Sequence, residues 1–296
     1  MSNNNLYNAK RNKKDEFYTT YKDIKKEIDV YFNYNINLFR DKTVLLPCDD
    51  YEKSNFTKYF IDNFDKFKLK RIISTCYNYN NKGKILIYEK NKIKNGNLKT
   101  NGDFRNDDIT ELRNKSDIII TNPPFSLFRE FFDWLINSNK LFLSVTNLPS
   151  LVCKNIFPFI QNNKVWLGNN KENFSGFVVP EYYNKKNNII KLNNTIWITN
   201  IDYRRYNNIE LKPINYHIQN SKHKEIKNIG FLKYDNLDAI NVPYIDSIPS
   251  DYEGIIGVPI TFLTKYNPKQ FKIIGIRNNL KINDKKVFGR ILIKKI

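Results

Sequence analysis

The chain has 296 residues, of which 49 are Lys or Arg and 30 are Asp or Glu, giving a formal net charge of +19. Hydrophobic residues make up 41% of the chain and aromatic residues 15%, enough for a core, so wholesale disorder is excluded. The sequence has neither the roughly eighteen consecutive apolar residues of a membrane span nor the apolar segment of a signal peptide, so we expect a cytoplasmic protein with no membrane partner. Cys48, Cys76 and Cys153 lack the spacing of a disulfide framework or a metal site, and no metal is expected.

The charge excess favours a polyanionic partner, because Lys and Arg side chains that contact phosphates release condensed counterions. The charge is also concentrated: residues 265–296 hold ten basic side chains and one acidic one, and residues 1–14 form a basic N-terminal arm. We therefore expect nucleic acid as the partner. In the competing interpretation, an AT-rich coding sequence has raised the lysine content without selection for binding.

Buried strands alternate with amphipathic helices through the first half of the chain. Short apolar runs rich in β-branched residues predict strands at 43–46, 71–76, 84–88, 116–121 and 141–145. Apolar residues at helical spacing predict helices at 24–32, 54–64 and 126–136, with Ser54 as the N-cap of the second. This alternation predicts an α/β sheet, mostly parallel and covered on both faces.

The alternation weakens beyond residue 150. There the pattern predicts a helix at 154–161 and strands at 164–167, 195–199 and 255–263. We expect one domain over residues 15–200, and we expect residues 201–296 to complete the sheet and add a smaller recognition element.

The most informative motif is Asn122-Pro123-Pro124-Phe125, which directly follows the predicted strand ending at Thr121. Chemistry in an open α/β sheet gathers at the carboxyl ends of its strands. Because the prolines fix the backbone and supply no N–H, the Asn122 side-chain oxygen and the Pro123 carbonyl can accept both protons of an exocyclic amine, while Phe125 stacks on its ring. Holding both N–H bonds out of the ring plane would localise the nitrogen lone pair and make the amine a nucleophile. A proline turn that merely ends a strand is the alternative, and the position of the motif favours the acceptor site.

The tetrapeptide matches the (N/D)PP(F/Y) signature of amino-methyltransferases, which alone does not separate adenine, cytosine, guanine or a protein glutamine as acceptor. Four further blocks accompany it in order, and the five blocks are residues 15–19 (DEFYT), 48–50 with 54–56 (CDD, SNF), 102–105 (GDFR), 121–128 (TNPPFSLF), and 257–263 with 266–268 (GVPITFL, YNP). Together they resemble the EcoRI-type adenine-specific DNA methyltransferase family along nearly the whole chain.

The resemblance implies a Rossmann-like methyltransferase sheet with a smaller C-terminal recognition element. It implies S-adenosylmethionine as the methyl donor and the N6 amino group of a flipped-out adenine in double-stranded DNA as the acceptor. Residues 15–200 would then be the methyltransferase catalytic domain and residues 201–296 the DNA-recognition and sheet-completing region. The resemblance also implies a restriction-modification system, with a cognate restriction endonuclease as a further partner, and a monomeric enzyme.

The family motifs assign roles to particular positions of this sequence. The catalytic residues would be Asn122, Pro123, Pro124 and Phe125. The cofactor would be bound by Phe17, Tyr18 and Thr19 at its methionine end, by the loop Cys48, Asp49 and Asp50 with Ser54 and Asn55, and by Asp103 and Phe104 at its adenine. Tyr51 stands where the family has a proline, and no carboxylate after residues 71–76 marks a partner for the ribose.

Three other functions remain to be weighed. An RNA or protein amino-methyltransferase would use the same motif, and a non-catalytic DNA-binding relative would keep the fold and the charge. The dipeptide Pro47-Cys48 resembles the nucleophile of cytosine-C5 methyltransferases, but we reject that mechanism because two acids follow Cys48 and would raise the pKa of its thiol.

Overall fold

The computed structural model describes residues 17–90, 92–170, 174–179, 189–203 and 223–296. The described residues divide into two compact units, one within Met1–Ile156 and Val165–Tyr203 and the other within Phe157–Lys164 and Arg204–Ile296. The predicted basic arm, residues 1–14, lies outside the described residues. No helix in the described ranges is long and apolar enough to cross a membrane.

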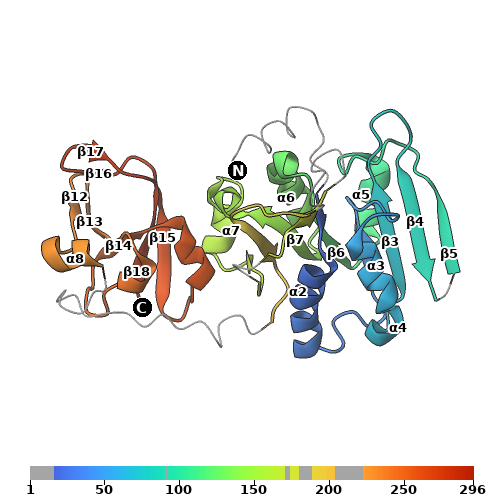
Figure 1. Ribbon diagram of the computed structural model, residues 1–296, viewed down its shortest axis with the longest axis horizontal. Coiled ribbons are helices and arrows are strands. Elements are labelled where there is room, and N and C mark those ends of the chain that lie inside the picture. Colours follow the sequence, from blue (N-terminus) through green and yellow to red (C-terminus); the bar gives the residue numbers. More distant parts are fainter. Residues whose placement is uncertain (1–16, 91, 171–173, 180–188, 204–222) are drawn as a thin grey trace. The chain divides into compact units, whose positions relative to one another are not determined.

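The first unit contains an eight-stranded sheet with the order β5-β4-β3-β2-β6-β7-β11-β8 (Figure 1). Its strands are β2 (Thr43–Leu46), β3 (Arg71–Cys76), β4 (Lys84–Glu89), β5 (Lys92–Asn97), β6 (Ile118–Thr121), β7 (Leu141–Asn147), β8 (Trp166–Leu167) and β11 (Thr195–Thr199). Its helices are α2 (Tyr21–Tyr34), α3 (Asn55–Asp62), α4 (Phe64–Phe67), α5 (Asp107–Asn114) and α6 (Phe128–Ile136), with 3-10 turns η1 (Phe125–Leu127) and η2 (Leu148–Val152). The predicted α/β class is confirmed.

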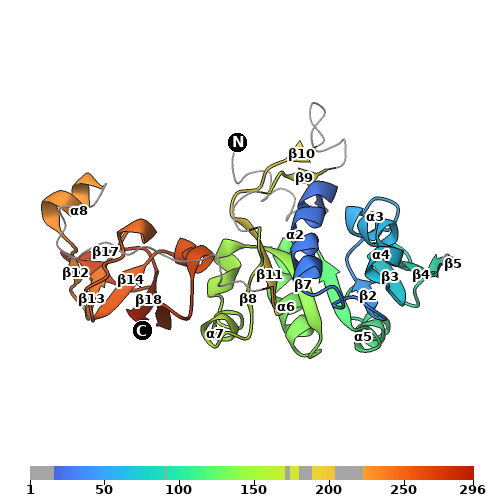
Figure 2. The same cartoon turned by 90° about the horizontal axis from the view of Figure 1, so that it is seen from below.

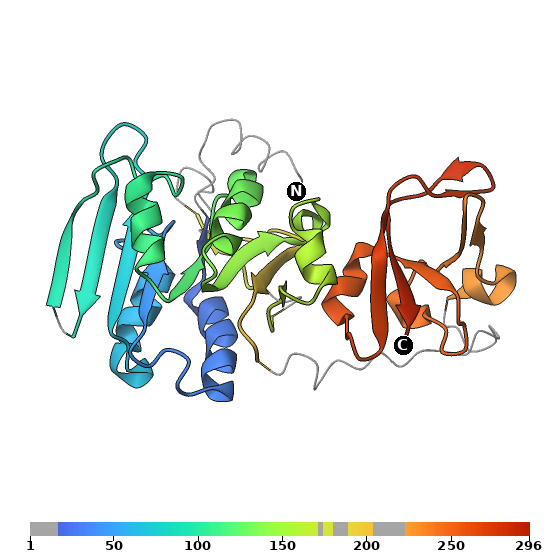
Figure 3. The ribbon, with the colours of Figure 1, turned by 180° about the vertical axis from the view of Figure 1, so that it is seen from behind.

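The four central strands β3, β2, β6 and β7 are parallel, as the apolar runs predicted. The outer strands are antiparallel: β4 and β5 form one edge, seen from behind in Figure 3, and β11 and β8 form the other. The strand predicted at 84–88 is therefore not parallel to β3. The connection 77–83 is too short for a crossover, which needs a dozen or more residues.

Helices cover both faces of this sheet. Figure 2 shows α2, α3 and α4 on one face and α5 and α6 on the other. Successive strand residues point to opposite faces, so Val44 and Leu46 join the aromatic core formed with α2 and α3, while Leu45 is fully buried on the other face. Helix α3 begins at the predicted cap, where the Ser54 Oγ accepts a hydrogen bond from the Phe56 N–H at 3.1 Å.

A second, three-stranded sheet in the first unit has the order β1-β9-β10. Its strands are β1 (Tyr18–Thr19), β9 (Phe177–Val178) and β10 (Ile189–Ile190). All pairs are antiparallel. This small sheet fixes the N-terminal motif against a segment about 160 residues later in the chain.

The second unit has its own five-stranded sheet, β12-β13-β14-β18-β15, and a separate hairpin, β16-β17. Its elements are α7 (Phe157–Gln161), α8 (Lys224–Ile229), β12 (Lys233–Tyr234), β13 (Leu237–Asn241), η4 (Ile245–Ser247), β14 (Ile255–Val258), η5 (Ile260–Lys265), β15 (Phe271–Arg277), β16 (Lys281–Ile282), β17 (Lys285–Lys286) and β18 (Arg290–Lys295).

Two expectations for this region are wrong. The described strands after residue 223 do not complete the eight-stranded sheet but form the separate one. The run 255–263 is not one strand: β14 ends at Val258, and η5 follows Pro259, whose missing N–H cannot continue a ladder.

Candidate active site

Loops at the carboxyl ends of β2, β3 and β6 enclose a cavity of about 420 Å³ in the first unit. Strand β1 and the loop before α5 complete its wall. The lining residues are Phe17, Tyr18, Thr19, Pro47, Cys48, Asp49, Asp50, Cys76, Tyr77, Gly102, Asp103, Phe104, Arg105, Asn122, Pro124, Ser126 and Leu127. The parallel order of β3, β2 and β6 brings these loops to one edge of the sheet.

Asn122 lines this cavity and has a buried side-chain oxygen. Its Nδ2 donates a hydrogen bond to the Phe17 carbonyl oxygen, which fixes the orientation of the amide. Its Oδ1 is buried and has no hydrogen-bond partner among the described residues. A buried acceptor left unpaired costs about 1–3 kcal/mol, so such an atom points to a ligand that supplies the missing donor.

The N-terminal motif lies beside Asn122. Phe17 stacks on Phe125 with ring centroids 6.5 Å apart, and Phe125 also meets Phe177 edge-on at 6.1 Å. The Thr19 carbonyl oxygen accepts a hydrogen bond from the Asn55 Nδ2 at 2.9 Å. The Thr19 Oγ1, like the Asn122 oxygen, is buried without a partner among the described residues.

Asp49 links three elements behind the cavity. Its carboxylate accepts hydrogen bonds from the Ser54 Oγ at 2.6 Å and from the Thr121 Oγ1 at 2.7 Å. Its backbone is also held, since the N–H donates to the Thr75 carbonyl at 2.9 Å and the carbonyl accepts from the Ser74 Oγ at 2.7 Å. Burial raises the pKa of Asp49 to about 6 even though the two hydroxyl donors lower it.

The rest of this loop is a turn that carries a half-buried cysteine. Burial raises the pKa of Cys48 well above its ordinary value, and the Asp49 carboxylate raises it further, so the thiol is protonated and a poor nucleophile. The Asp50 carboxylate accepts from the Glu52 N–H at 3.1 Å, and the Asp50 carbonyl accepts from the N–H groups of Lys53 and Ser54.

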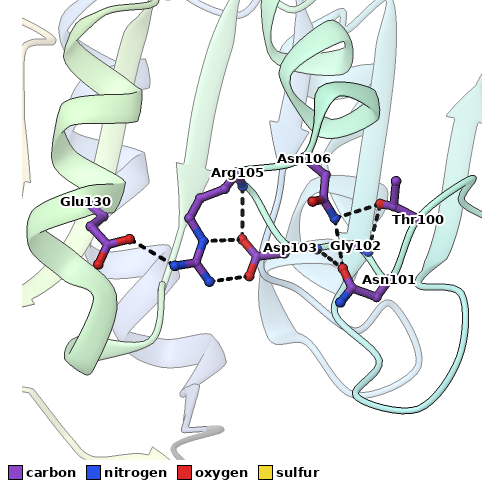
Figure 4. A network of polar contacts seen from close by, with 7 residues as sticks. All are labelled: Thr100, Asn101, Gly102, Asp103, Arg105, Asn106 and Glu130. Carbon is purple, nitrogen blue, oxygen red and sulfur yellow. Dashed lines mark hydrogen bonds and ion pairs between the residues drawn. The ribbon is translucent and has the colours of Figure 1, made fainter.

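Asp103 is held by its neighbour Arg105 (Figure 4). The Asp103 Oδ1 accepts from the Arg105 N–H at 3.0 Å and Nε at 2.9 Å, and Oδ2 accepts from Nη2 at 2.6 Å. The remaining guanidinium nitrogen of Arg105, Nη1, donates a hydrogen bond to the Glu130 Oε2 at 2.9 Å. These bonds from Arg105 lower the pKa of Asp103, which is therefore ionised at neutral pH.

The loop that carries Asp103 requires glycine at its start. Gly102 has φ of +83°, and a Cβ there would lie 2.5 Å from the Cys76 carbonyl oxygen at the end of β3. The loop is tightened by the Thr100 Oγ1, which accepts from the Gly102 N–H at 3.3 Å, and by the Asn101 Oδ1, which accepts from the Asp103 N–H at 3.2 Å (Figure 4).

Ten residues that the sequence singled out line the cavity: Phe17, Tyr18, Thr19, Cys48, Asp49, Asp50, Asp103, Phe104, Asn122 and Pro124. The other four do not line it. Pro123 is buried, Phe125 packs between Phe17 and Phe177, Ser54 supports Asp49, and Asn55 supports Thr19. Phe104 lines the cavity and also packs edge-on against Phe131, 5.1 Å away between ring centroids.

Seven lining residues were not assigned a role from the sequence: Pro47, Cys76, Tyr77, Gly102, Arg105, Ser126 and Leu127. Their positions in the chain carried a signal, because each ends or follows a predicted strand or belongs to a quoted motif. Tyr77, 45% exposed, stands directly after β3, where a carboxylate was sought and not found. Across the described residues, no group of three or more His, Cys, Asp or Glu side chains is placed to hold a metal ion.

Comparison with known proteins identifies the family. A sequence model of the family described as adenine-specific methyltransferase EcoRI matches residues 5–295. The chain belongs to this family.

Curated relatives cover almost the same length as this member of the EcoRI adenine-specific methyltransferase family. The chain is 40% identical to Type II methyltransferase M.EcoRI of Escherichia coli, over 99% of this chain and 97% of that protein. It is 34% identical to Type II methyltransferase M.MgeORF184P of Mycoplasma genitalium (92% and 86%) and 32% identical to M.MpnI of Mycoplasma pneumoniae (92% and 85%). No solved structure matches the chain significantly. Membership makes the protein an adenine-specific methyltransferase, and the cavity holding Asn122 is its candidate active site.

Proposed function

We propose that this protein transfers a methyl group from S-adenosylmethionine to the N6 amino group of adenine in double-stranded DNA. The observation that carries the proposal is the Asn122 Oδ1, buried at the cavity with its amide fixed by Phe17 and its oxygen unpaired among the described residues. Such an oxygen matches an N–H donor, and the exocyclic amine of adenine is one.

The cavity fits S-adenosylmethionine in size and charge. Its volume of about 420 Å³ lies within the usual range for small-molecule sites. Three acids, Asp49, Asp50 and Asp103, line it and suit a cationic ligand. The unpaired Thr19 Oγ1 offers a polar contact at the methionine end, and Asp103 with Phe104 would hold the adenine.

The residues of the chain would orient and activate the acceptor. S-adenosylmethionine, when bound, supplies an electrophilic methyl group. The Asn122 oxygen accepts an N–H of the acceptor amine, which draws the lone pair away from the ring and toward the reacting carbon. Asp49 and Thr121 hold the strand end that carries Asn122, so the oxygen keeps its position.

The charge of the second unit favours a nucleic acid as the substrate. The described part of the second unit contains 14 Lys and Arg residues and 7 Asp and Glu residues. The named relatives are Type II methyltransferases. An adenine must leave the base stack to reach a cavity of this kind, and stacking and hydrogen bonds in the pocket offset the cost of a few kcal/mol.

The test is to incubate the purified protein with methyl-labelled S-adenosylmethionine and, separately, unmethylated duplex DNA, RNA or protein extract. Nucleic acids are then digested to nucleosides and the labelled one is identified. We expect label in N6-methyladenine from DNA. Label in RNA or protein alone would replace the substrate and retain the site, and no transfer with intact DNA binding would make the protein a non-catalytic DNA-binding relative.

A further inference from the structure

A hairpin in the second unit presents lysines and an aromatic ring to solvent. Strand β16 pairs with β17, and Phe288 follows two residues after the hairpin. Phe288 is 88% exposed, more than any other large hydrophobic side chain among the described residues. Folding alone does not explain this residue, because its ring gains no burial.

Hydrogen bonds and core packing hold the hairpin in place. The Asp235 carboxylate accepts hydrogen bonds from the N–H groups of Asn283 at 3.2 Å and Asp284 at 2.8 Å, so it fixes the turn. The Val287 N–H donates to the Leu280 carbonyl at 2.9 Å, and both side chains pack in the core of this unit.

The loop that carries the ring is fixed as well. The Arg290 Nη1 donates to the carbonyl oxygens of Phe288 at 3.3 Å and Gly289 at 3.5 Å, while its Nε donates to the Asn241 Oδ1 at 3.0 Å. A Cβ at Gly289 would lie 2.5 Å from the Asn278 Oδ1, so the loop is also closely packed. A ring displayed on a fixed loop loses little further freedom when it binds a partner.

The lysines of the hairpin point to an anionic partner. Lys281 lies directly opposite Lys286 across the hairpin, and like charges in that position oppose pairing. Lys285, which pairs with Ile282, is exposed on the same hairpin, and between described residues no ion pair forms at any of the three lysines. An anion placed over the hairpin would relieve this repulsion, and the neighbouring ring calls for a flat apolar group next to that anion.

We propose that Lys281, Lys285, Lys286 and Phe288, here called the hairpin surface, dock on duplex DNA. The lysines contact backbone phosphates, and the Phe288 ring makes an apolar contact with base edges in a groove. This proposal rests on the proposed function, since it takes DNA as the substrate. It adds an element outside the cavity lining that binds this substrate.

The test measures the affinity of the full-length protein for a short fluorescein-labelled unmethylated duplex by anisotropy over a range of salt concentrations. The variants are Phe288→Ala, Phe288→Trp and the triple change of Lys281, Lys285 and Lys286 to Gln. Ile229→Ala, an exposed apolar residue of the same unit on α8, is the matched control. Thermal unfolding of each variant establishes that it is folded.

We expect Phe288→Ala to weaken binding by about ten-fold to a hundred-fold with an unchanged salt slope, because the ring buries apolar area on binding and carries no charge. Phe288→Trp should bind like the unchanged protein. The triple lysine variant should lower the slope of log affinity against log salt by roughly 0.9 per lost phosphate contact. Ile229→Ala should change neither quantity.

Two results would overturn the proposal while leaving the proposed function intact. In the first, the unchanged protein binds and methylates DNA, and every variant keeps the same affinity and the same salt slope. The other is a lower slope in Phe288→Ala, which would mean that the ring only positions the lysines. Failure of the unchanged protein to methylate DNA would instead refute the proposed function.

Discussion

Among single residues, Asn122 combines a satisfied donor with an unsatisfied acceptor. Its Nδ2 is bonded to the Phe17 carbonyl, and its Oδ1 is buried and unpaired among the described residues. A fold optimised only for stability would pair that oxygen or replace the side chain. The unpaired oxygen is the basis of the proposal that Asn122 accepts an N–H of the substrate.

Replacing Asn122 with Ala should lower kcat by a factor of about 100 or more, because one preorganised hydrogen bond to the reacting group is lost. Binding of S-adenosylmethionine and of DNA should persist, as measured by calorimetry and anisotropy. Asn122→Asp keeps an acceptor oxygen and should retain more activity than Asn122→Ala. An unchanged kcat in the alanine variant would exclude Asn122 as the acceptor of the amine proton.

Arg105 is the residue that sets the state of Asp103. It contributes three of the hydrogen bonds to that carboxylate, and its side chain is half exposed at the cavity. Because these bonds lower the pKa of Asp103, the carboxylate stays ionised well into the acid range.

We predict that Arg105→Gln raises the KM for S-adenosylmethionine several-fold with little change in kcat. Without the guanidinium the pKa of Asp103 rises, so the KM should begin to increase at a higher pH than in the unchanged protein as the solution is acidified. Steady-state kinetics across pH measures this. Arg129→Gln, an exposed arginine on α6, is the control, and identical pH profiles for both variants would refute the role of Arg105.

Among elements, β2, β6 and α3 meet at one buried carboxylate. Asp49 follows β2, its donor Thr121 ends β6, and its donor Ser54 caps α3. Asp49 is only 3% exposed, so its charge is poorly solvated and its pKa is raised to about 6.

This raised pKa predicts a pH-dependent stability. The folded protein binds the proton of Asp49 more tightly than the unfolded chain, whose pKa is about 3.9, so the contribution of this group is fully present below about pH 4 and lost as the pH rises through about 6. Asp49→Asn cannot ionise. Its free energy of unfolding relative to the unchanged protein should therefore increase by up to about 3 kcal/mol between about pH 4 and pH 7, as measured by urea denaturation. Parallel curves would contradict the assignment.

Buried elements were predictable because an apolar run and its flanking residues carry the signal. The strands predicted at 43–46, 71–76 and 195–199 match β2, β3 and β11 residue for residue. The polar strand β5 was missed, since all six of its residues are exposed and nothing in its composition indicates burial. The single strand predicted at 255–263 was wrong because β14 ends at Val258, directly before Pro259.

The site was predictable where a motif named its residues and not where the sheet brought distant loops together. Asn122 and Asp103 were found from their motifs. Arg105 belongs to the quoted block 102–105, but its contact with Asp103 became visible only in the folded loop. Tyr77 belongs to no motif and reaches the cavity because β3 lies beside β2. Strand order is a property of the folded sheet, and local spacing does not encode it.

In the whole molecule, the cavity and the hairpin surface belong to different units. Every lining residue of the cavity belongs to the first unit, and the hairpin belongs to the second. The two proposals therefore place donor binding and DNA docking in separately packed parts of one chain.

This division predicts a localised response to S-adenosylmethionine. Amide hydrogen exchange should slow in peptides covering residues 17–19, 47–50, 102–105 and 122–127, because bound ligand stabilises the first unit by mass action. Peptides from β14, β15 and β18 should exchange at unchanged rates. Mass spectrometry with and without the ligand measures both. Equal protection throughout the chain, or none near the cavity, would contradict the assignment.

The hydrogen bond from Asn122 to Phe17 also leaves Asn122 able to accept a hydrogen bond from a ligand but not to donate one through Nδ2. An asparagine free to turn over would offer either its oxygen or its amino group, and would accept amino and keto bases alike. With Nδ2 committed to a backbone carbonyl, only the oxygen is left to pair with an incoming group. If Asn122 receives the base as proposed, a base carrying a keto oxygen at that position would place oxygen against oxygen, so we expect the pocket to reject thymine and hypoxanthine.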